Sequence, residues 1–216
     1  MLTLDTISYR YKGGDRDVLK EVSATLEAGK LHAIVGPSGS GKTTLLSIMA
    51  GLDAPRGGRV LIDGEDLAGI NLDIYRKQKI AMIFQAFQLF PLLTARENVR
   101  FPMELNGTGK KDATHRAIEL LESVGITPDK HRRYPANLSG GEQQRVAIAR
   151  SLASGARVLL ADEPTGNLDA ANGQAVMDIL KGLAHQQGYC VVVVTHNHEI
   201  ADASDVVLRM SDGMFI

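Results

Sequence analysis

The spacing of apolar residues changes twice along the chain and divides it into strand-rich ends and a helical middle. In residues 2–29 apolar and polar positions alternate, first around Leu4 and again around Ala24, and residues 12–15 form a glycine-rich turn between them. This pattern predicts short antiparallel strands. A further strand is predicted at residues 59–62, immediately before another turn.

Four short runs are mostly apolar and predict buried strands. In chain order they are Leu31–Val35, Ile80–Phe84, Arg157–Glu163 and Tyr189–Thr195. The third run is apolar on both faces, which is typical of a strand in a parallel sheet that helices cover. The sequence therefore predicts an α/β protein with a mostly parallel main sheet and an antiparallel β subdomain at its N-terminus.

The middle of the chain, residues 86–156, reads as mostly helical. A capping box at residues 94–97 opens one helix, and a second helix is predicted at about residues 112–124. We therefore expect residues 1–85 and 157–216 to form one α/β core, into which residues 86–156 are inserted as an α-helical subdomain.

One segment after the first buried strand fits the pattern G-x-x-x-x-G-K-[ST] in full. It reads Gly36-Pro37-Ser38-Gly39-Ser40-Gly41-Lys42-Thr43, and a helical segment that stops at Gly51 follows it. In this strand–loop–helix context, inward-pointing backbone N–H groups and the positive end of a helix bind phosphate oxygens. Lys42 is then placed to reach the β- and γ-phosphates of a nucleoside triphosphate, and the Thr43 hydroxyl to ligate Mg²⁺. The sequence thus predicts a phosphate loop in a P-loop NTPase core.

Four polar side chains stand at the ends of predicted strands, where ligand groups gather in α/β folds. Gln85 follows the second buried strand and His196 follows the fourth, while Asp162 and Glu163 end the third. Asp162 is placed to hold Mg²⁺, directly or through water, and Glu163 to orient or deprotonate an attacking water. A lone histidine at a strand end is usually structural, but this grouping favours a functional role for His196.

Two other features each have two interpretations. Ser139 and Glu142 form a second capping box, so the helix start at Gly140-Gly141 is either a second anion site or simply a well-capped helix, and physical reasoning alone leaves these even. Tyr11, just before the first turn, could stack on an adenine ring, but its spacing alone favours a half-buried strand tyrosine.

The composition is ordinary for a globular protein, with 44% hydrophobic and 23% charged residues. A formal net charge of −1 gives no indication of a nucleic-acid partner. Cys190, the one cysteine, excludes an intrachain disulfide and is interpreted as a small core residue. No apolar stretch approaches the ~20 residues that span a bilayer, and the N-terminus lacks the regions of a signal peptide. We therefore expect a cytoplasmic protein.

Taken in chain order, these motifs resemble the nucleotide-binding subunits of ABC (ATP-binding cassette) transporters over essentially the whole chain. The residues that carry the resemblance are the phosphate loop, Gln85 in the glutamine loop, Leu138–Glu142 as the signature segment, Val158–Asp162 as the second nucleotide motif, Glu163 as the catalytic glutamate, Asp169 as the D-loop aspartate and His196 as the switch histidine. The signature is the most specific of these, because phosphate loops also occur in GTPases and kinases. The absence of an N-K-x-D guanine motif weakens the GTPase interpretation.

The resemblance implies a full set of site residues. Those implied to bind ATP are Tyr11, which would stack on adenine, Gly36, Pro37, Ser38, Gly39, Ser40, Gly41, Lys42, Thr43, Thr44, Ser139, Gly140, Gly141, Glu142 and Asp169. Those implied in catalysis are Glu163, His196 and Gln85, and those implied to hold Mg²⁺ are Thr43, Gln85 and Asp162.

The resemblance also implies an ATPase that works as a homodimer on a membrane partner. Two copies sandwich two ATP molecules head to tail, with each phosphate loop facing the signature segment of the other copy. ATP closes the pair and hydrolysis opens it. Integral membrane permease subunits, docked near Gln85 and the helical subdomain, convert this cycle into movement of a substrate. The protein is then peripheral on the cytoplasmic face of the inner membrane.

Within the family, residues 94–99 and 164–169 resemble the bacterial branch of lipoprotein-release and macrolide-export ATPases. One departure from the family pattern is at residues 54–58, which read Ala-Pro-Arg-Gly-Gly, where the family more often has a Pro-Thr/Ser-Gly turn. This loop is expected to lie away from the catalytic residues.

Two alternative functions remain. One is a soluble single-cassette ABC ATPase of an assembly or repair system, and the other is a regulatory module without turnover. The intact Glu163 and His196 argue against the second alternative.

Overall fold

A computed structural model describes the backbone of residues 1–216 and every side chain except that of His198. Its strands are β1 (Leu2–Tyr9), β2 (Leu19–Leu26), β3 (Leu31–Val35), β4 (Gly57–Ile62), β5 (Glu65–Asp66), β6 (Ile80–Phe84), β7 (Val158–Asp162), β8 (Cys190–Thr195), β9 (Val206–Ser211) and β10 (Met214–Phe215). Its α-helices are α1 (Lys42–Met49), α2 (Leu72–Gln78), α3 (Ala95–Leu105), α4 (Lys110–Ser123), α5 (Gly140–Leu152), α6 (Ala170–Gln187) and α7 (His198–Asp202). Short 3₁₀ helices lie at Leu67–Gly69, Pro128–Lys130 and Pro135–Asn137.

The larger sheet has the strand order β10-β9-β3-β8-β7-β6 and is parallel except for the pairing of β10 with β9. Its register places Phe84 opposite Asp162, and Val35 opposite Thr195. Consequently the residues that follow β3, β6, β7 and β8 meet at one edge of the sheet. The predicted α/β fold with a mostly parallel sheet is confirmed.

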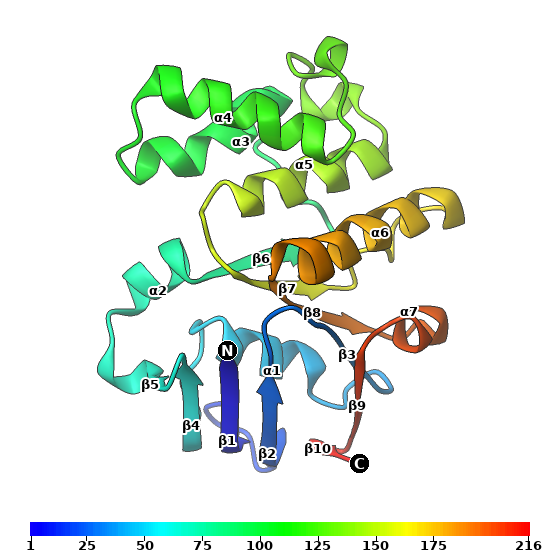
Figure 1. Cartoon of the computed structure of the whole chain (residues 1–216). Helices are drawn as coiled ribbons and strands as arrows, with labels where there is room; N and C mark the ends of the chain where they lie inside the picture. The colour runs from blue at the N-terminus through cyan, green and yellow to red at the C-terminus, as the bar shows by residue number, and fades with distance from the viewer.

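This sheet is covered on both faces, as Figure 1 shows for α5 and α6 on one side and the antiparallel sheet on the other. On β8, Val191 and Val193 belong to the core that contains residues of α3, α4, α5 and α6. The intervening Val192 and Val194 belong to a second core, built with α1 and the antiparallel sheet of order β2-β1-β4-β5. Residues 191–194 of β8 are therefore all apolar, because each face of the strand packs against a different core.

Most predicted elements are present, and several short ones were not predicted. Both capping boxes form, at residues 94–97 and 139–142, with reciprocal side-chain and backbone hydrogen bonds. The second helix of the middle region, α4, begins at Lys110, two residues before the predicted start at 112. The elements that were not predicted are α2, α7, β5, β9 and β10. Two of them, β5 and β10, have only two residues, while α2 buries only Tyr75 and β9 only Met210, so their apolar patterns are too sparse to detect.

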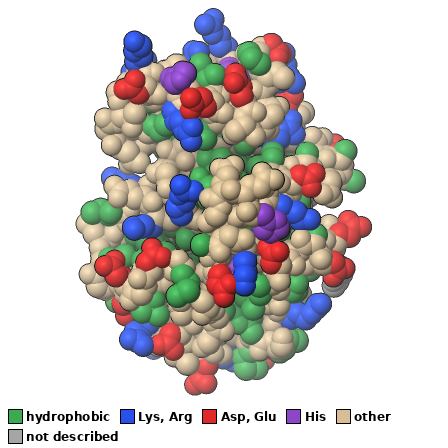
Figure 2. Space-filling view, viewed as in Figure 1, with side chains coloured by type: hydrophobic (Ala, Val, Ile, Leu, Met, Phe, Trp, Pro, Cys, Tyr) green, Lys and Arg blue, Asp and Glu red, His purple; other side chains and the backbone are tan. Residues whose placement is uncertain are grey.

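The helical region is joined closely to the core. α5 packs against α3 and α4 but also against β6 and α6. The proposed division at residues 85 and 157 therefore stays a prediction. Among the helices described, none combines the length and apolarity needed to cross a bilayer. On the face shown in Figure 2, acidic and basic side chains are interspersed.

Two side chains hold the connection from β6 to α3. Arg150 on α5 donates from Nη1 to the carbonyl oxygen of Gln88 at 2.6 Å and from Nη2 to that of Phe87 at 3.2 Å. Phe87 and Gln88 both have left-handed backbone conformations, with φ values of 55° and 49°. Such conformations persist only where the surroundings impose them, and the Arg150 contacts are part of that constraint.

Asn98 of α3 holds the remainder of this connection and is fully buried. Its Oδ1 accepts a hydrogen bond from the backbone N–H of Phe90 at 2.8 Å. Its Nδ2 donates to the carbonyl oxygens of Phe90, Leu93 and Thr94 at 3.1, 2.9 and 3.1 Å. The carbonyl oxygens of Phe90 and Thr94 also accept backbone N–H groups, so the Phe90 N–H and the Leu93 carbonyl oxygen are the two groups whose partner is the Asn98 amide.

We expect Asn98→Ala to lower the free energy of unfolding by about 2–4 kcal/mol, because it leaves the Phe90 N–H and the Leu93 carbonyl oxygen without partners. The measurement is urea unfolding followed by circular dichroism. Asn106→Ala is the matched control. Asn106 is exposed at the end of α3, and its replacement should change the free energy by less than about 0.5 kcal/mol. Equal stability of the two variants would contradict this account of the connection.

Candidate active site

The phosphate loop, residues 36–43, runs from the end of β3 into the first turn of α1. Its backbone passes so close to β9 that a Cβ atom at Gly36 would lie 2.1 Å from the carbonyl oxygen of Met210. Gly41, which begins the turn into α1, has a left-handed φ of 104°. These two positions require glycine for different physical reasons, namely close approach and backbone conformation.

A cavity of about 460 Å³ lies beside this loop. Its lining consists of Tyr11, Val18, Ser38, Gly39, Gly41, Lys42, Thr43, Thr44, Asp162, Glu163, Val194 and His196. Lys42 is largely buried, and its Nζ donates to the carbonyl oxygens of Gly36 and Pro37 at 2.8 and 2.9 Å. The structure therefore brings predicted residues from four distant segments of the chain to one cavity.

The carboxylate of Asp162, the last residue of β7, is partly buried in this cavity. Burial, together with the like charge of the neighbouring Glu163, raises the pKa of Asp162, whereas the positive charge of Lys42 opposes that rise. A raised pKa means that the ionised carboxylate is held at some electrostatic cost. A bound cation would relieve that cost, so the environment favours a positively charged ligand here.

Glu163 has a left-handed backbone, with φ of 48°, and its N–H donates to the carbonyl oxygen of Val194 at 2.9 Å. This conformation ends the strand and turns the side chain into the cavity wall. Oε1 of Glu163 lies 2.7 Å from Nδ1 of His196, and Oε2 accepts from Thr195 Oγ1 at 3.4 Å. The carboxylate is thus oriented by two groups from the end of β8, and this residue is one of the places where backbone strain is stored.

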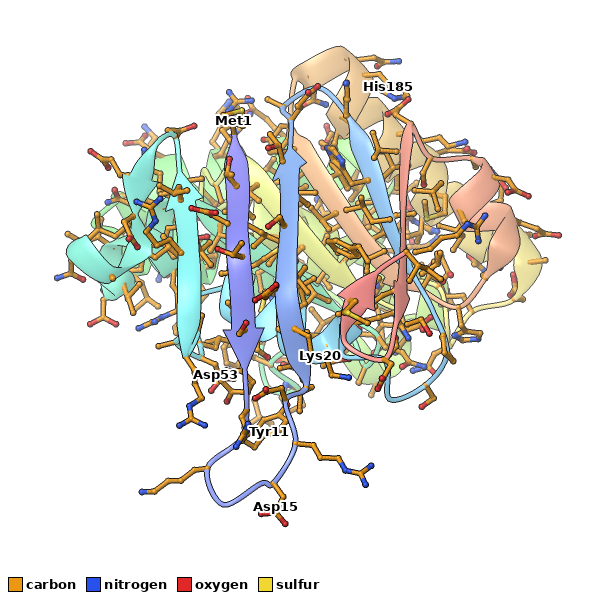
Figure 3. The ribbon with its side chains drawn as sticks, turned by 90° about the horizontal axis from the view of Figure 1, so that it is seen from below. Met1, Tyr11, Asp15, Lys20, Asp53 and His185 are labelled. Atoms are coloured by element: carbon orange, nitrogen blue, oxygen red, sulfur yellow. The ribbon has the colours of Figure 1, made fainter. Side chains whose placement is uncertain are left out.

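Tyr11 lies beyond the end of β1, on the loop that also carries Asp15 (Figure 3). Its side chain is half exposed, its hydroxyl is hydrogen-bonded to Thr44 Oγ1 at 2.8 Å, and its ring meets that of Tyr9 edge to face with centroids 5.1 Å apart. The interpretation as a strand tyrosine is therefore wrong. Stacking of Tyr11 on adenine stays a prediction, which its place in the cavity wall supports.

Gln85 lies at the predicted sheet edge but does not line the cavity. Its Nε2 donates to Asn167 Oδ1 at 3.2 Å, and Asn167 Nδ2 donates back to the carbonyl oxygen of Gln85 at 3.0 Å. No feature of the sequence around residue 167 indicates this pairing, because it depends on two loops that meet only in the folded protein.

The signature segment lies at the start of α5, and its residues are not among those that line the cavity of the same chain. Ser139 Oγ accepts from the N–H of Glu142, and Glu142 Oε2 accepts from the N–H of Ser139. Lys130 Nζ contacts Glu142 Oε1 at 2.8 Å, and this hydrogen bond is the main reason that the pKa of Glu142 is lowered. Asp169 caps α6 by accepting from the N–H of Asn172 at 2.8 Å.

The side-chain oxygens at the cavity suit a Mg²⁺ ion that binds together with a nucleotide. The part of the chain with described side chains contains no group of three His, Cys, Asp or Glu residues able to hold a metal alone. Mg²⁺ at nucleotide sites needs only one or two protein oxygens, because phosphates and waters supply the others. Thr43 and Asp162 line the same cavity and offer those oxygens. Gln85, the third predicted ligand, is held elsewhere by Asn167.

Comparison with known families agrees with this geometry. The family described as "ABC transporter" matches residues 19–166, which include the phosphate loop, the signature segment and both carboxylates at the end of β7. The chain belongs to the ABC transporter family. The resemblance stated from the sequence is confirmed.

Two relatives and one solved structure show which members of the family the chain resembles. The lipoprotein-releasing system ATP-binding protein LolD of Shewanella frigidimarina is 45% identical, over 99% of this chain and 91% of that protein. The macrolide export ATP-binding/permease protein MacB of Brucella melitensis is 41% identical over 100% of this chain, which spans only 34% of that protein. A dimeric structure of the ATP-binding cassette MJ0796 bound to ADP and Pi superposes with a TM-score of 0.89 at 38% identity, covering 100% of this chain and 96% of that one.

We expect Tyr11→Ala to weaken binding of ATP more than binding of inorganic triphosphate, because stacking involves only the base. The loss for ATP should be about 5- to 100-fold, the range of an aromatic–base stack worth 1–3 kcal/mol. Tyr11→Phe keeps the ring, loses the hydroxyl bonded to Thr44, and is the matched control. Equal losses for both ligands in a calorimetric titration would show that Tyr11 has a structural role.

Proposed function

We propose that this protein is the ATP-binding and ATP-hydrolysing subunit of an ABC transporter. One observation carries the proposal: Lys42, Thr43, Asp162, Glu163 and His196 line a single cavity. A lysine in a glycine-rich loop suits the phosphates, while the two carboxylates in the same cavity suit a metal ion and an attacking water. Membership of the ABC transporter family supports ATP as the nucleotide.

In this proposal Glu163 accepts a proton from the water that attacks the γ-phosphate. His196, 2.7 Å from Glu163 Oε1, holds the carboxylate in one orientation. Lys42 stabilises negative charge on the phosphates, and Thr43 and Asp162 would hold Mg²⁺. Bound Mg²⁺ neutralises phosphate charge. Chemistry of this kind depends on positioning and charge stabilisation more than on covalent catalysis.

The signature segment is proposed to act on the ATP bound by a second copy of the chain. The first N–H groups of α5 have no acceptors within the helix, so they can bind a phosphate. They lie outside the cavity of their own chain. A dimeric structure of a cassette 38% identical to this one supports a two-copy assembly.

We further propose that the dimer works on integral membrane permease subunits at the cytoplasmic face of the inner membrane. The relatives named for lipoprotein release and macrolide export support this placement. The alternative is a soluble single-cassette ATPase of an assembly or repair system. Co-purification of the tagged protein with a multi-spanning membrane protein, after mild detergent extraction, decides between them.

Glu163→Gln should retain ATP binding and lose about 10²–10⁴-fold in hydrolysis, because an amide cannot accept the proton from water. The measurement is single-turnover phosphate release, with ATP affinity determined in parallel. Glu122→Gln, at an exposed acid on α4, is the control and should hydrolyse ATP at the parent rate. Single-turnover hydrolysis at the parent rate in Glu163→Gln would remove Glu163 from the catalytic role.

Gly140→Asp should prevent ATP-dependent dimerisation while leaving ATP binding by the monomer unchanged. A Cβ at position 140 makes only ordinary contacts of 3.5 Å or more, whereas one at Gly141 would lie 2.2 Å from Asn172 Oδ1. Position 140 therefore accepts a side chain without disturbing the fold. The new carboxylate would face the γ-phosphate held by the partner, and the two negative charges repel.

The experiment uses the Glu163→Gln background, in which ATP should trap the dimer. Gel filtration with ATP should show dimer for Glu163→Gln alone and monomer once Gly140→Asp is added. Gly140→Asn, which has the same size without the charge, should retain more dimer. If Gly140→Asp weakens ATP binding by the monomer as severely as Lys42→Ala, then the signature segment acts on its own chain's nucleotide and the sandwich proposal is wrong.

A further inference from the structure

The loop that follows Glu163, residues 164–169, is tied to its surroundings by amide side chains. Gln144 of α5 is fully buried and donates to the carbonyl oxygen of Pro164 at 2.8 Å. Asn172 of α6 donates to Asp169 Oδ2 at 2.8 Å. Asn167, in the loop itself, is exposed and pairs with Gln85 at the end of β6. The loop thus connects the catalytic edge of the sheet with α5 and α6.

The pair formed by Asn167 and Gln85 is reciprocal, since each residue donates one hydrogen bond from its side-chain amide to the other. The distances are 3.2 Å from Gln85 Nε2 to Asn167 Oδ1 and 3.0 Å from Asn167 Nδ2 to the carbonyl oxygen of Gln85. The Gln85 amide also packs on Gly166, where a Cβ would lie 2.7 Å from Nε2. The loop therefore provides a fitted position for this amide outside the nucleotide cavity.

That position competes with any role of Gln85 at the metal. The oxygens suited to Mg²⁺ come from Thr43 and Asp162, which line the cavity, and Gln85 does not line it. Phe84 pairs with Asp162 across the sheet, so Gln85 begins about one strand spacing, ~4.8 Å, from the end of β7. Rotation about its side-chain bonds can carry the amide towards Asp162, but only after it leaves Asn167.

We propose that Asn167 is a positioning residue that holds Gln85 away from the metal and releases it when the metal and nucleotide bind. The inference rests on the proposed function and assigns to the loop a restraint on metal affinity. A fraction of the molecules has Gln85 released, and that fraction scales the apparent affinity for the metal. Removing the restraint therefore strengthens metal binding.

The test uses Mn²⁺ in place of Mg²⁺, with the full-length protein saturated with a non-hydrolysable ATP analogue. Free Mn²⁺ is measured by electron paramagnetic resonance, so the readout is binding and not turnover. Asn167→Ala should tighten Mn²⁺ binding about two- to tenfold, the range expected for the one net hydrogen bond that restrains the Gln85 amide. Asn106→Ala is the control for loss of an exposed asparagine and should bind Mn²⁺ like the parent.

A double-mutant cycle with Gln85→Ala isolates the coupling. In the Gln85→Ala background, Asn167→Ala should no longer change Mn²⁺ affinity, because the Gln85 amide that Asn167 restrains is already absent. An equal effect in both backgrounds, no effect in either, or parent-like affinity in Gln85→Ala would overturn the inference while leaving the ATPase proposal intact. Failure of the parent protein itself to bind Mn²⁺ with the nucleotide would overturn both.

Discussion

The register of the parallel sheet is the constraint on which the rest of the structure depends. β3, β8, β7 and β6 lie side by side and end within one residue of one another, so four separate loops begin at one edge. A shift of one residue in β7 would turn Asp162 to the opposite face and exchange the two cores that its neighbours occupy. The apolar residues on both faces of these strands therefore fix the positions of the polar groups at their ends.

Several residues in and near the site have backbone conformations or charges that are unfavourable on their own. Glu163 is left-handed, Asp162 carries a charge in partly buried surroundings, and Phe87 with Gln88 adds two more unusual backbone conformations nearby. These features are maintained by the well-packed sheet and by contacts such as those of Arg150. Strain and electrostatic cost are concentrated where ligand binding can relieve them, which is the usual distribution in sites that bind and convert charged substrates.

Much of the fold and the phosphate-binding half of the site could be predicted from the sequence because their signals are local. The glycines and Lys42 of the phosphate loop, the capping boxes and the continuous apolar strands each occupy a few consecutive residues. The place of Tyr11 could not be settled from spacing, since the end of β1 depends on pairing with β2 and β4. The hydrogen-bond partner of Gln85 could not be predicted either, because Asn167 lies 82 positions away in the chain.

The contact between Gly36 and Met210 has a consequence for the order in which the protein is made. The phosphate loop is translated well before its supporting wall, β9. The N–H of Gly213 also donates to the carbonyl oxygen of Ser40 at 3.1 Å, so the next turn braces the same loop. During vectorial synthesis the loop must wait for these residues before it reaches its final shape. The shape that lets this loop bind a phosphate thus depends on residues that are translated well after the motif itself.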